Sequence, residues 1–341
     1  MSSLLAAPST PSVRKPAFAV SFGSASADDW ARALSSISVE AGLAPAVDAA
    51  EVVLAARTDA PSPALGDTGS VALGFGDDAP RPVLTGSVRA VHRTVHGKTR
   101  VVASNGSAAL ASFRVDQGYE QRKAGDIVTD LAGRAGVEVG SVDAGAELPY
   151  FVVDGRSSAW EHVARLAELS GFAAWVDGDE NLHFGPLQTG APAQTFTYAE
   201  DVLELDAIEA PPALGSVTVV GEGAAGSKGS DAWSWNAKDA SPVKATSGSG
   251  DPAVVVRMPA ARSSDAAQAA ADGLAAKAKL GGLTARLLVP GAPKAAVAST
   301  VEIKGAPDDK LNGSWLVRGV RHKLVKSQGY TTLLLLAKGT T

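Results

Sequence analysis

The chain has 341 residues, of which 45% are hydrophobic and 20% are charged; its net charge is -5 and it contains no cysteine. The length and composition indicate a folded protein of two to four compact units rather than a disordered chain. Without cysteine, a disulfide framework, a thiolate nucleophile and a cysteine-ligated zinc site are excluded.

The N-terminal part of the chain is predicted to be rich in β-structure. Residues 1–15, in which Ser, Pro and Ala dominate, are expected to form a flexible arm, and residues 16–122 a first antiparallel β-barrel domain. Within Asp28 to Leu43 a helical stripe overlaps a two-residue alternation, and we expect a strand in the second half. The other expected strands are residues 17–22, 52–55, 70–74, 82–95 and 100–103.

Residues 123–194 are predicted to form a connecting domain of helices followed by a hairpin. The first helix is expected to end at Gly136. The second begins with the capping-box pair Ser158 and Glu161 and ends at Gly171. The predicted hairpin consists of residues 172–176, the turn 177–180 and residues 182–184.

Residues 195–341 are predicted to form a second β-barrel domain, so the fold class is α+β and mostly β. Residues 221–251, full of Gly, Ser, Lys and Asp, are expected to form an exposed loop, and residues 264–280 an alanine-rich helix. A β-rich region is expected to start near Thr195, with Phe196, Tyr198, Val202 and Leu205, and to continue through residues 216–220. The further expected strands are residues 254–258, 283–289, 299–303, 314–326 and 330–336.

The charges are unevenly distributed along the chain. Ten acidic residues and no Lys or Arg occur between Leu166 and Ser227, whereas residues 290–341 contain eight basic and three acidic residues. This polarity suits copies that pack head to tail or against a differently charged partner, although ordinary solvated faces would give the same pattern. Because nucleic-acid binders depend on clustered Lys and Arg, specific nucleic-acid binding is not expected.

Membrane insertion and export are not expected either. The first 20 residues lack the basic and apolar regions of an export signal, and the longest apolar runs are far shorter than the roughly 20 residues that span a bilayer.

The motifs that suggest chemistry are weak. Gly221 to Gly226 matches G-x-G-x-x-G after a strand, but Ser-Lys-Gly-Ser follows it, and that motif needs a helix there to hold pyrophosphate. His92 and His96 would be roughly 13 Å apart in a strand, too far for one zinc ion. The other histidines, His162, His183 and His322, are scattered and are interpreted as structural or surface residues.

Two further features remain as candidates for function. The acid pairs Glu200-Asp201 and Asp308-Asp309 do not identify the cleft that glycoside hydrolysis requires. Trp233 and Trp235, in a polar segment, are typical of a contact surface or of side chains folded back on the domain. No catalytic, cofactor-binding or metal-binding residue is therefore assigned, no cofactor is expected, and no enzymatic activity is predicted.

Several segments together resemble the hub family of contractile tails, which includes phage late control protein D and the N-terminal part of VgrG spikes. The resemblance extends over about residues 65–336 and consists of packing and turn residues. Its segments are residues 65–67, 84–88, 126–132 (DIVTDLA), 160–172, 175–178, 182–184, 313–317, 320–322 and 329–333.

The resemblance implies a structural baseplate hub: a homotrimer in which each chain contributes two tube-like barrels to a pseudo-sixfold ring. Such a ring joins a hexameric tail tube to a trimeric spike and contacts other baseplate proteins. Because fused spikes continue into further domains whereas this chain stops at Thr341, a separate spike protein is expected. The expected location is a virion tail or contractile injection particle, assembled in the bacterial cytoplasm.

Two other classes of function remain open. A β-rich module that binds a glycan or receptor would stay monomeric and bind polysaccharide, and an enzyme would lose activity when one carboxylate or histidine is replaced. If the acids of residues 166–227 line the channel of a ring, they would ease the passage of polyanions by repulsion; otherwise they would meet a basic partner ring.

Overall fold

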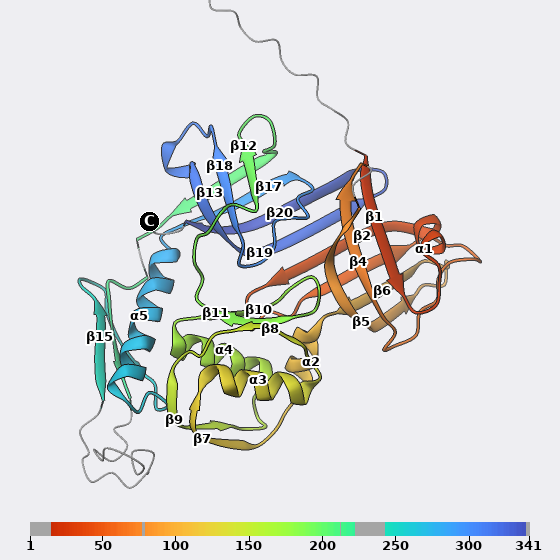
Figure 1. Cartoon of the computed structure of the whole chain (residues 1–341). Helices are drawn as coiled ribbons and strands as arrows, with labels where there is room; N and C mark the ends of the chain where they lie inside the picture. The colour runs from red at the N-terminus through yellow and green to blue at the C-terminus, as the bar shows by residue number, and fades with distance from the viewer. Residues whose placement is uncertain (1–14, 77–78, 212, 222–242, 339–341) are drawn as a thin grey trace, which may run out of the picture.

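The fold is dominated by one 12-stranded sheet to which both ends of the chain contribute (Figure 1). The computed structural model describes residues 15–76, 79–211, 213–221 and 243–338. The main path of the sheet is β1-β4-β5-β6-β3-β2-β19-β20-β17-β13, and β18 and β12 extend it beside β19. The mostly β, α+β fold class is confirmed.

The N-terminal half of the sheet comes from six consecutive strands. They are β1 (Pro16–Phe22), β2 (Leu34–Gly42), β3 (Ala49–Leu54), β4 (Thr68–Phe75), β5 (Arg81–Arg93) and β6 (Thr99–Ser104). The helix α1 (Ala27–Ala33) precedes β2, which confirms a strand in the second half of the ambiguous segment. Buried side chains of these strands, Trp30 of α1 and two residues of the C-terminal half form one hydrophobic core.

The C-terminal half contains β12 (Gln194–Thr197), β13 (Glu204–Glu209), β17 (Leu283–Pro290), β18 (Thr300–Lys304), the short 3-10 helix η1 (Asp309–Leu311), β19 (Gly313–Val325) and β20 (Gly329–Lys338). These strands surround a second core that includes Phe196 and Trp315. The halves meet where β2 pairs antiparallel with β19, from Ser36 opposite Val325 to Gly42 opposite Gly319.

Helices and short strands form a layer beneath and beside the large sheet (Figure 1). The helices are α2 (Gly106–Ser112), α3 (Ala124–Ala135), α4 (Ala159–Ser170) and α5 (Ser264–Leu280). The short sheets are β8 (Val139–Val142) with β10 (Ala173–Val176) and β11 (Leu182–Gly185), β7 (Gln117–Lys123) with β9 (Glu147–Val153), and β14 (Ser216–Val220) with β15 (Lys244–Gly248) and β16 (Ala253–Arg257). Their buried side chains form the third core.

The helices follow their local signals. The Ser158 side chain accepts from the Glu161 amide at 3.3 Å, and the Glu161 carboxylate accepts from the Ser158 amide at 2.7 Å, so the predicted capping box begins α4. Gly171 ends α4 in the left-handed region at φ 68°. A Cβ on Gly273 of α5 would lie 2.2 Å from Gly171 Cα, so glycine permits the close approach of the two helices.

Some elements differ from the expectations. The predicted loop 221–251 contains strand β15, because Lys244–Gly248 pairs with β14 in the sheet that α5 covers. Residues 222–242 of this loop lie outside the described residues, as do residues 1–14 of the predicted arm 1–15. The helix α2 and the β7–β9 pair were not predicted. Asn105 caps α2 by accepting from the Ser107 amide at 3.1 Å.

The layer is attached to the large sheet at two places. The Trp160 indole of α4, only 1% exposed, donates to the Ala46 carbonyl at 2.8 Å, just after β2. Buried Asp48 accepts from the Gly42 amide at 2.9 Å and from the Asn105 side chain at 2.8 Å. On the other side, Thr85 of β5 donates to the Gly178 carbonyl at the tip of the β10–β11 hairpin.

Candidate functional surfaces

One end of the large sheet is an acidic strand. Among the described strands β13 pairs only with β17, so its other side is an open edge. Glu204, Asp206 and Glu209 are exposed on this strand, and of the three only Glu209 has an ion pair among the described residues, with Lys310 at 2.8 Å. Leu203 and Ile208 are also exposed, at 58% and 62%. The unpaired backbone groups of an open edge are a template for pairing with another chain, and its exposed carboxylates would restrict that pairing to a chain of opposite charge.

A basic strand segment lies toward the other end of the sheet, in β5, two strands in from the edge strand β1. The long strand β5 pairs with β4 only through residues 81–87, and from Ser87 to Arg93 its one strand partner in the described chain is β6. Arg89 and Arg93 are exposed there; Arg93 donates to the Ser62 hydroxyl at 2.9 Å, Arg89 attracts the Glu180 carboxylate, and neither guanidinium forms a close ion pair among the described residues. This strand segment is therefore complementary in charge to β13.

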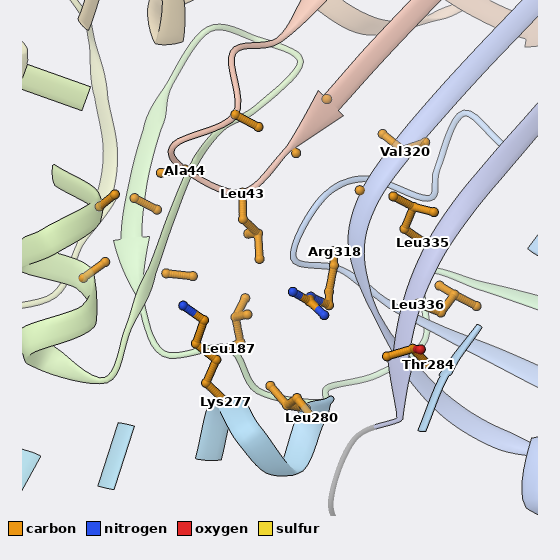
Figure 2. Close-up of a pocket in the computed structure, with 18 of the residues that line it drawn as sticks. Leu43, Ala44, Leu187, Lys277, Leu280, Thr284, Arg318, Val320, Leu335 and Leu336 are labelled. Atoms are coloured by element: carbon orange, nitrogen blue, oxygen red, sulfur yellow. The ribbon is translucent and has the colours of Figure 1, made fainter. Parts of the chain in front are cut away.

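A cleft of about 1110 Å³ lies between the large sheet and the helix layer (Figure 2). Figure 2 shows that the Arg318 side chain projects into it, with Leu43, Leu187 and Leu280 around it and Leu335 and Leu336 on the β20 side. Three of its lining side chains are large, apolar and exposed, since Val47, Ile208 and Leu335 are 45%, 62% and 47% accessible.

The charges of the cleft are partly paired. Arg321 forms an ion pair with Glu40 at 2.8 Å, and Lys277 lies 3.9 Å from Glu168. Arg318 has no ion pair within the described ranges, and the same holds for Arg286, although Asp206 stands opposite it in the β13–β17 register. The cleft thus combines aliphatic walls with uncompensated guanidinium groups.

The histidines lie far apart in the structure. His92 is near the end of β5 and His96 lies in the turn after it, so the two do not share a strand as the spacing argument assumed. His162 is buried in α4, where its Nε2 lies 3.0 Å from the Asp154 carbonyl. His322 is buried and bonds Tyr330 and Thr332 through Nδ1; burial lowers its pKa to about 4, so it is neutral at pH 7.

The remaining sequence candidates do not converge on one site. Of the G-x-G-x-x-G segment only Gly221 is described, and Trp233 and Trp235 lie outside the described residues. Asp201 accepts from the Thr197 amide and Asp308 from the Lys310 amide, so one acid of each pair caps local backbone. The described residues contain no group of three His, Asp or Glu side chains placed to hold a metal ion.

Two arrangements of polar side chains were not predicted. Ser141, His183 and Asp177 form a continuous hydrogen-bonded chain in the small sheet β10–β11–β8. Asp48 is 1% exposed, and burial raises its pKa to about 6. Both combine residues far apart in sequence, so neither forms a motif; the only local signal was the Asp-Gly turn that contains Asp177.

Solved structures with the same fold are tail proteins. The 43 kDa tail protein of prophage MuSo2 from Shewanella oneidensis has a TM-score of 0.69 at 13% identity, with 94% of this chain and 98% of that chain aligned. A tail protein from Neisseria meningitidis MC58 has a TM-score of 0.70 at 15% identity, with 95% and 97% aligned. At these identities the likeness establishes the fold.

A third structure is an E. coli component of the type VI secretion system that is described as similar to T4 bacteriophage tail proteins. Its TM-score is 0.60 at 11% identity, over 91% of this chain and 74% of that one. No curated protein is significantly similar to the chain in sequence. None of the helices in the described ranges has the length and apolar character of a membrane-spanning segment.

A protein-family model described as the Alg8 N-terminal domain matches residues 66–326. This match includes most of the chain, from strand β4 to strand β19, with the helix layer and much of the cleft lining. The chain therefore belongs to the Alg8 N-terminal domain family.

Proposed function

We propose that this protein is a structural hub in the tail of a phage or of a contractile injection particle, where three copies form a ring between a tail tube and a separate spike. The observation that carries the proposal is a pair of complementary open strand edges in the large sheet, acidic along β13 and basic along the second half of β5, where β4 no longer pairs. The fold shared with tail proteins supports it independently.

In this ring β13 of one copy pairs with residues 89–93 of β5 in the next copy. Both segments are about the same length, since β13 has six residues, and Glu204 and Asp206 would approach Arg89 and Arg93. The contact joins two different surfaces, so it is heterologous, and repeating it by a fixed rotation closes a ring. Strand pairing also satisfies backbone groups that an open edge leaves to water.

The arrangement of the sheet suits a pseudo-sixfold ring. Four strands from the N-terminal half, β5-β6-β3-β2, continue into four from the C-terminal half, β19-β20-β17-β13. Three copies would then present six four-stranded units to a hexameric tube. The proposed barrel domains, residues 16–122 and 195–341, supply these units, and the connecting domain of residues 123–194 supports the ring from one side.

The partners that follow from this role are the tube protein, the spike protein and other baseplate proteins, with assembly in the bacterial cytoplasm. The described acids of residues 166–227 are divided among α4, the hairpin turn, the β12–β13 connection and β13; Glu222 lies outside the described residues. In the proposed ring those on β13 meet a basic neighbour, which favours the partner interpretation of the acidic stretch over a channel lining.

Light scattering of the purified protein, alone and with the spike protein, tests the proposal. The expected mass is three times the 34.4 kDa of one chain, or a complex of three chains with three spike chains. Glu204→Lys with Asp206→Lys, or Arg89→Glu with Arg93→Glu, should weaken association at least tenfold, about 1.4 kcal/mol. All four changes in one chain should restore it, and high salt should weaken the wild-type ring.

Arg122→Glu is the matched control, because Arg122 is exposed on β7, which belongs to a separate two-stranded sheet and to neither edge. A protein that stays monomeric at every concentration and with the spike protein contradicts the ring. A trimer that all edge variants leave unchanged keeps the ring and rejects this pair of edges.

A further inference from the structure

A bulge in the small sheet β10–β11–β8 places a serine against a histidine. In the parallel pairing of β11 with β8, Leu182 stands opposite Val139 and Phe184 opposite Val142, so His183 alone faces the two residues Gly140 and Ser141. A bulge of this kind re-aims a side chain out of the regular alternation. Here it brings the Ser141 hydroxyl 2.8 Å from His183 Nδ1.

The hydrogen bonds of the imidazole determine which nitrogen is protonated. The backbone amide of Ser141 donates to Nδ1 at 3.3 Å, so Nδ1 is an acceptor, and the Ser141 hydroxyl, 2.8 Å away, donates to the same nitrogen. The proton of the neutral ring is then on Nε2, which lies 2.8 Å from the Asp177 carboxylate. Serine, base and carboxylate are thereby aligned in the protonation state that removes a hydroxyl proton.

Neighbouring side chains hold the ring in this position. The Trp175 indole stacks on it with centroids 5.3 Å apart and an interplanar angle of 15°. Gly140 leaves room for it, because a Cβ there would lie 2.6 Å from His183 Cε1. The other Asp177 oxygen accepts from the amides of Asp179 and Asn181 at 3.0 and 2.9 Å.

The charge of Asp177 follows from these contacts. Burial alone would raise the pKa of its carboxyl, but the hydrogen bonds from His183 and from the Asn181 amide outweigh burial and lower the pKa. Asp177 is therefore ionised at neutral pH and stabilises the imidazolium that forms when His183 takes a proton. Ser141 is exposed and the His183 side chain is 20% accessible, so small molecules reach the hydroxyl.

We propose that Ser141 is an activated nucleophile that reacts with small activated acyl and phosphonyl esters, with His183 as its general base and Asp177 as the positioning carboxylate. The arrangement has the roles of a serine-hydrolase triad with the two ring nitrogens exchanged. It is independent of the ring proposed above, because none of the three residues belongs to β13 or to the open part of β5.

Transfer of an acyl or phosphonyl group to Ser141 moves one proton and needs no oxidant or reductant. The Ser141 oxygen forms a bond to the carbonyl carbon or phosphorus and its proton moves to His183 Nδ1. The bond to the leaving group breaks, and the leaving group, the alcohol oxygen of an ester or the fluoride of a fluorophosphonate, departs with that proton. For an acyl ester, water then attacks the acyl-serine and His183 accepts the proton of the water. His183 returns this proton to the Ser141 oxygen as the acyl–oxygen bond breaks, and the carboxylic acid is released. Assistance by a positioned general base typically contributes 10²–10⁴-fold, so reaction about 100-fold faster than at an unassisted serine is expected.

Two measurements on the full-length protein test the proposal. A fluorophosphonate probe followed by peptide mass mapping should label Ser141 at pH 7.5, and p-nitrophenyl acetate should be hydrolysed with transient acylation of the same residue. Ser141→Ala should abolish labelling, and His183→Gln should slow it about 100-fold. Ser112→Ala is the matched control and should change nothing, since Ser112 is an exposed serine that donates to the Ala108 carbonyl.

A structural role for the same hydrogen bonds gives different results. Because His183→Gln can disturb the sheet, nitrogen NMR of the wild-type imidazole provides a second test: Nε2 should be protonated and Nδ1 bare, and Asp177→Asn should alter this signature. Labelling of Ser141 no faster than that of Ser112, or a ring protonated at Nδ1, would overturn the proposal.

Discussion

The large sheet contains two kinds of strand edge, which are used in opposite ways. One is the pairing of β2 with β19 inside the chain, called the joint below; the other is the pair of open edges along β13 and the second half of β5. At the joint, β2 and β19 pair over seven residues from each strand, and Ile37, Val39 and Leu324 are buried on the core side. At the open edges, β13 and the second half of β5 present exposed carboxylates and guanidiniums that lack close ion pairs among the described residues apart from Glu209.

The difference shows what each edge needs in order to pair. The joint lies inside one molecule, so burial of apolar area stabilises the pairing of β2 with β19, and charged side chains contribute little to its stability. The open edges meet only if two molecules collide in the right orientation, and complementary charge raises the rate of association and rejects wrong registers. The following predictions test the joint, from the largest effect to the smallest.

Truncation of Trp160 should weaken the joint most. This indole is buried in the helix layer and bonds the loop after β2, so Trp160→Ala leaves a cavity and is expected to cost about 3–5 kcal/mol of unfolding free energy. Trp160→Phe, which keeps most of the packing, should cost about 1 kcal/mol. Urea denaturation measures both, and equal losses in the two variants would show that packing at Trp160 does not support the joint.

Acidification should weaken the joint through His322. Its pKa is about 4 in the folded protein against about 6.5 when unfolded, so the unfolded chain takes up the proton first. Stability is complete above pH 6.5 and falls as the pH decreases toward 4, by about 2 kcal/mol between pH 7 and 5. Denaturation of the wild type and of His322→Gln at both pH values should show that the change in stability between pH 7 and 5 differs between the two proteins by about 2 kcal/mol, with the wild type losing more.

Acidification should instead increase the stability of the folded protein through Asp48. Its pKa of about 6 exceeds the unfolded value of about 3.8, so its contribution to stability is complete below pH 3.8 and is lost as the pH rises through 6. Between pH 7 and 5 it should return about 1 kcal/mol of stability. Asp48→Asn should therefore lose more stability than the wild type on acidification, and an unchanged pH dependence would contradict the assignment.

The exposed ion pair across the joint should matter least. Arg321 and Glu40 are 2.8 Å apart, but about half of each side chain is accessible. A double-mutant cycle with Arg321→Ala and Glu40→Ala should give a coupling below about 1 kcal/mol. A larger coupling energy would mean that charge also stabilises the joint. The contrast with the open edges, where complementary charge selects the partner, would then not hold.

Elements with complete local signals could be predicted from the sequence. The helix at Ser264–Leu280 has the predicted bounds, and α4 begins at its capping box and ends at Gly171, because these signals act within one turn of helix. The helix α2 was missed because Asn105, Gly106 and Ser107 are typical turn residues. In the structure the Asn105 side chain accepts from the Ser107 amide and caps the first turn of α2.

The functional surfaces depend on contacts between distant segments. The second half of β5 has an open edge because the pairing with β4 stops at Ser87. Neither the composition nor the periodicity of β5 indicates where its neighbour stops. The Ser141–His183 contact joins residues 42 positions apart through a bulge. Periodicity predicts which face of a strand is buried, but it does not identify the neighbour of that strand.

The pairing of β2 with β19 also affects how the protein is made. Ser36 and Val325, which face each other across this joint, are nearly 290 residues apart. At roughly 5–20 residues per second, a ribosome needs on the order of tens of seconds to add the second strand after the first. During that interval the edge of β2 that later meets β19 has no strand partner, so the nascent N-terminal half is most exposed to misassembly before the last strands emerge.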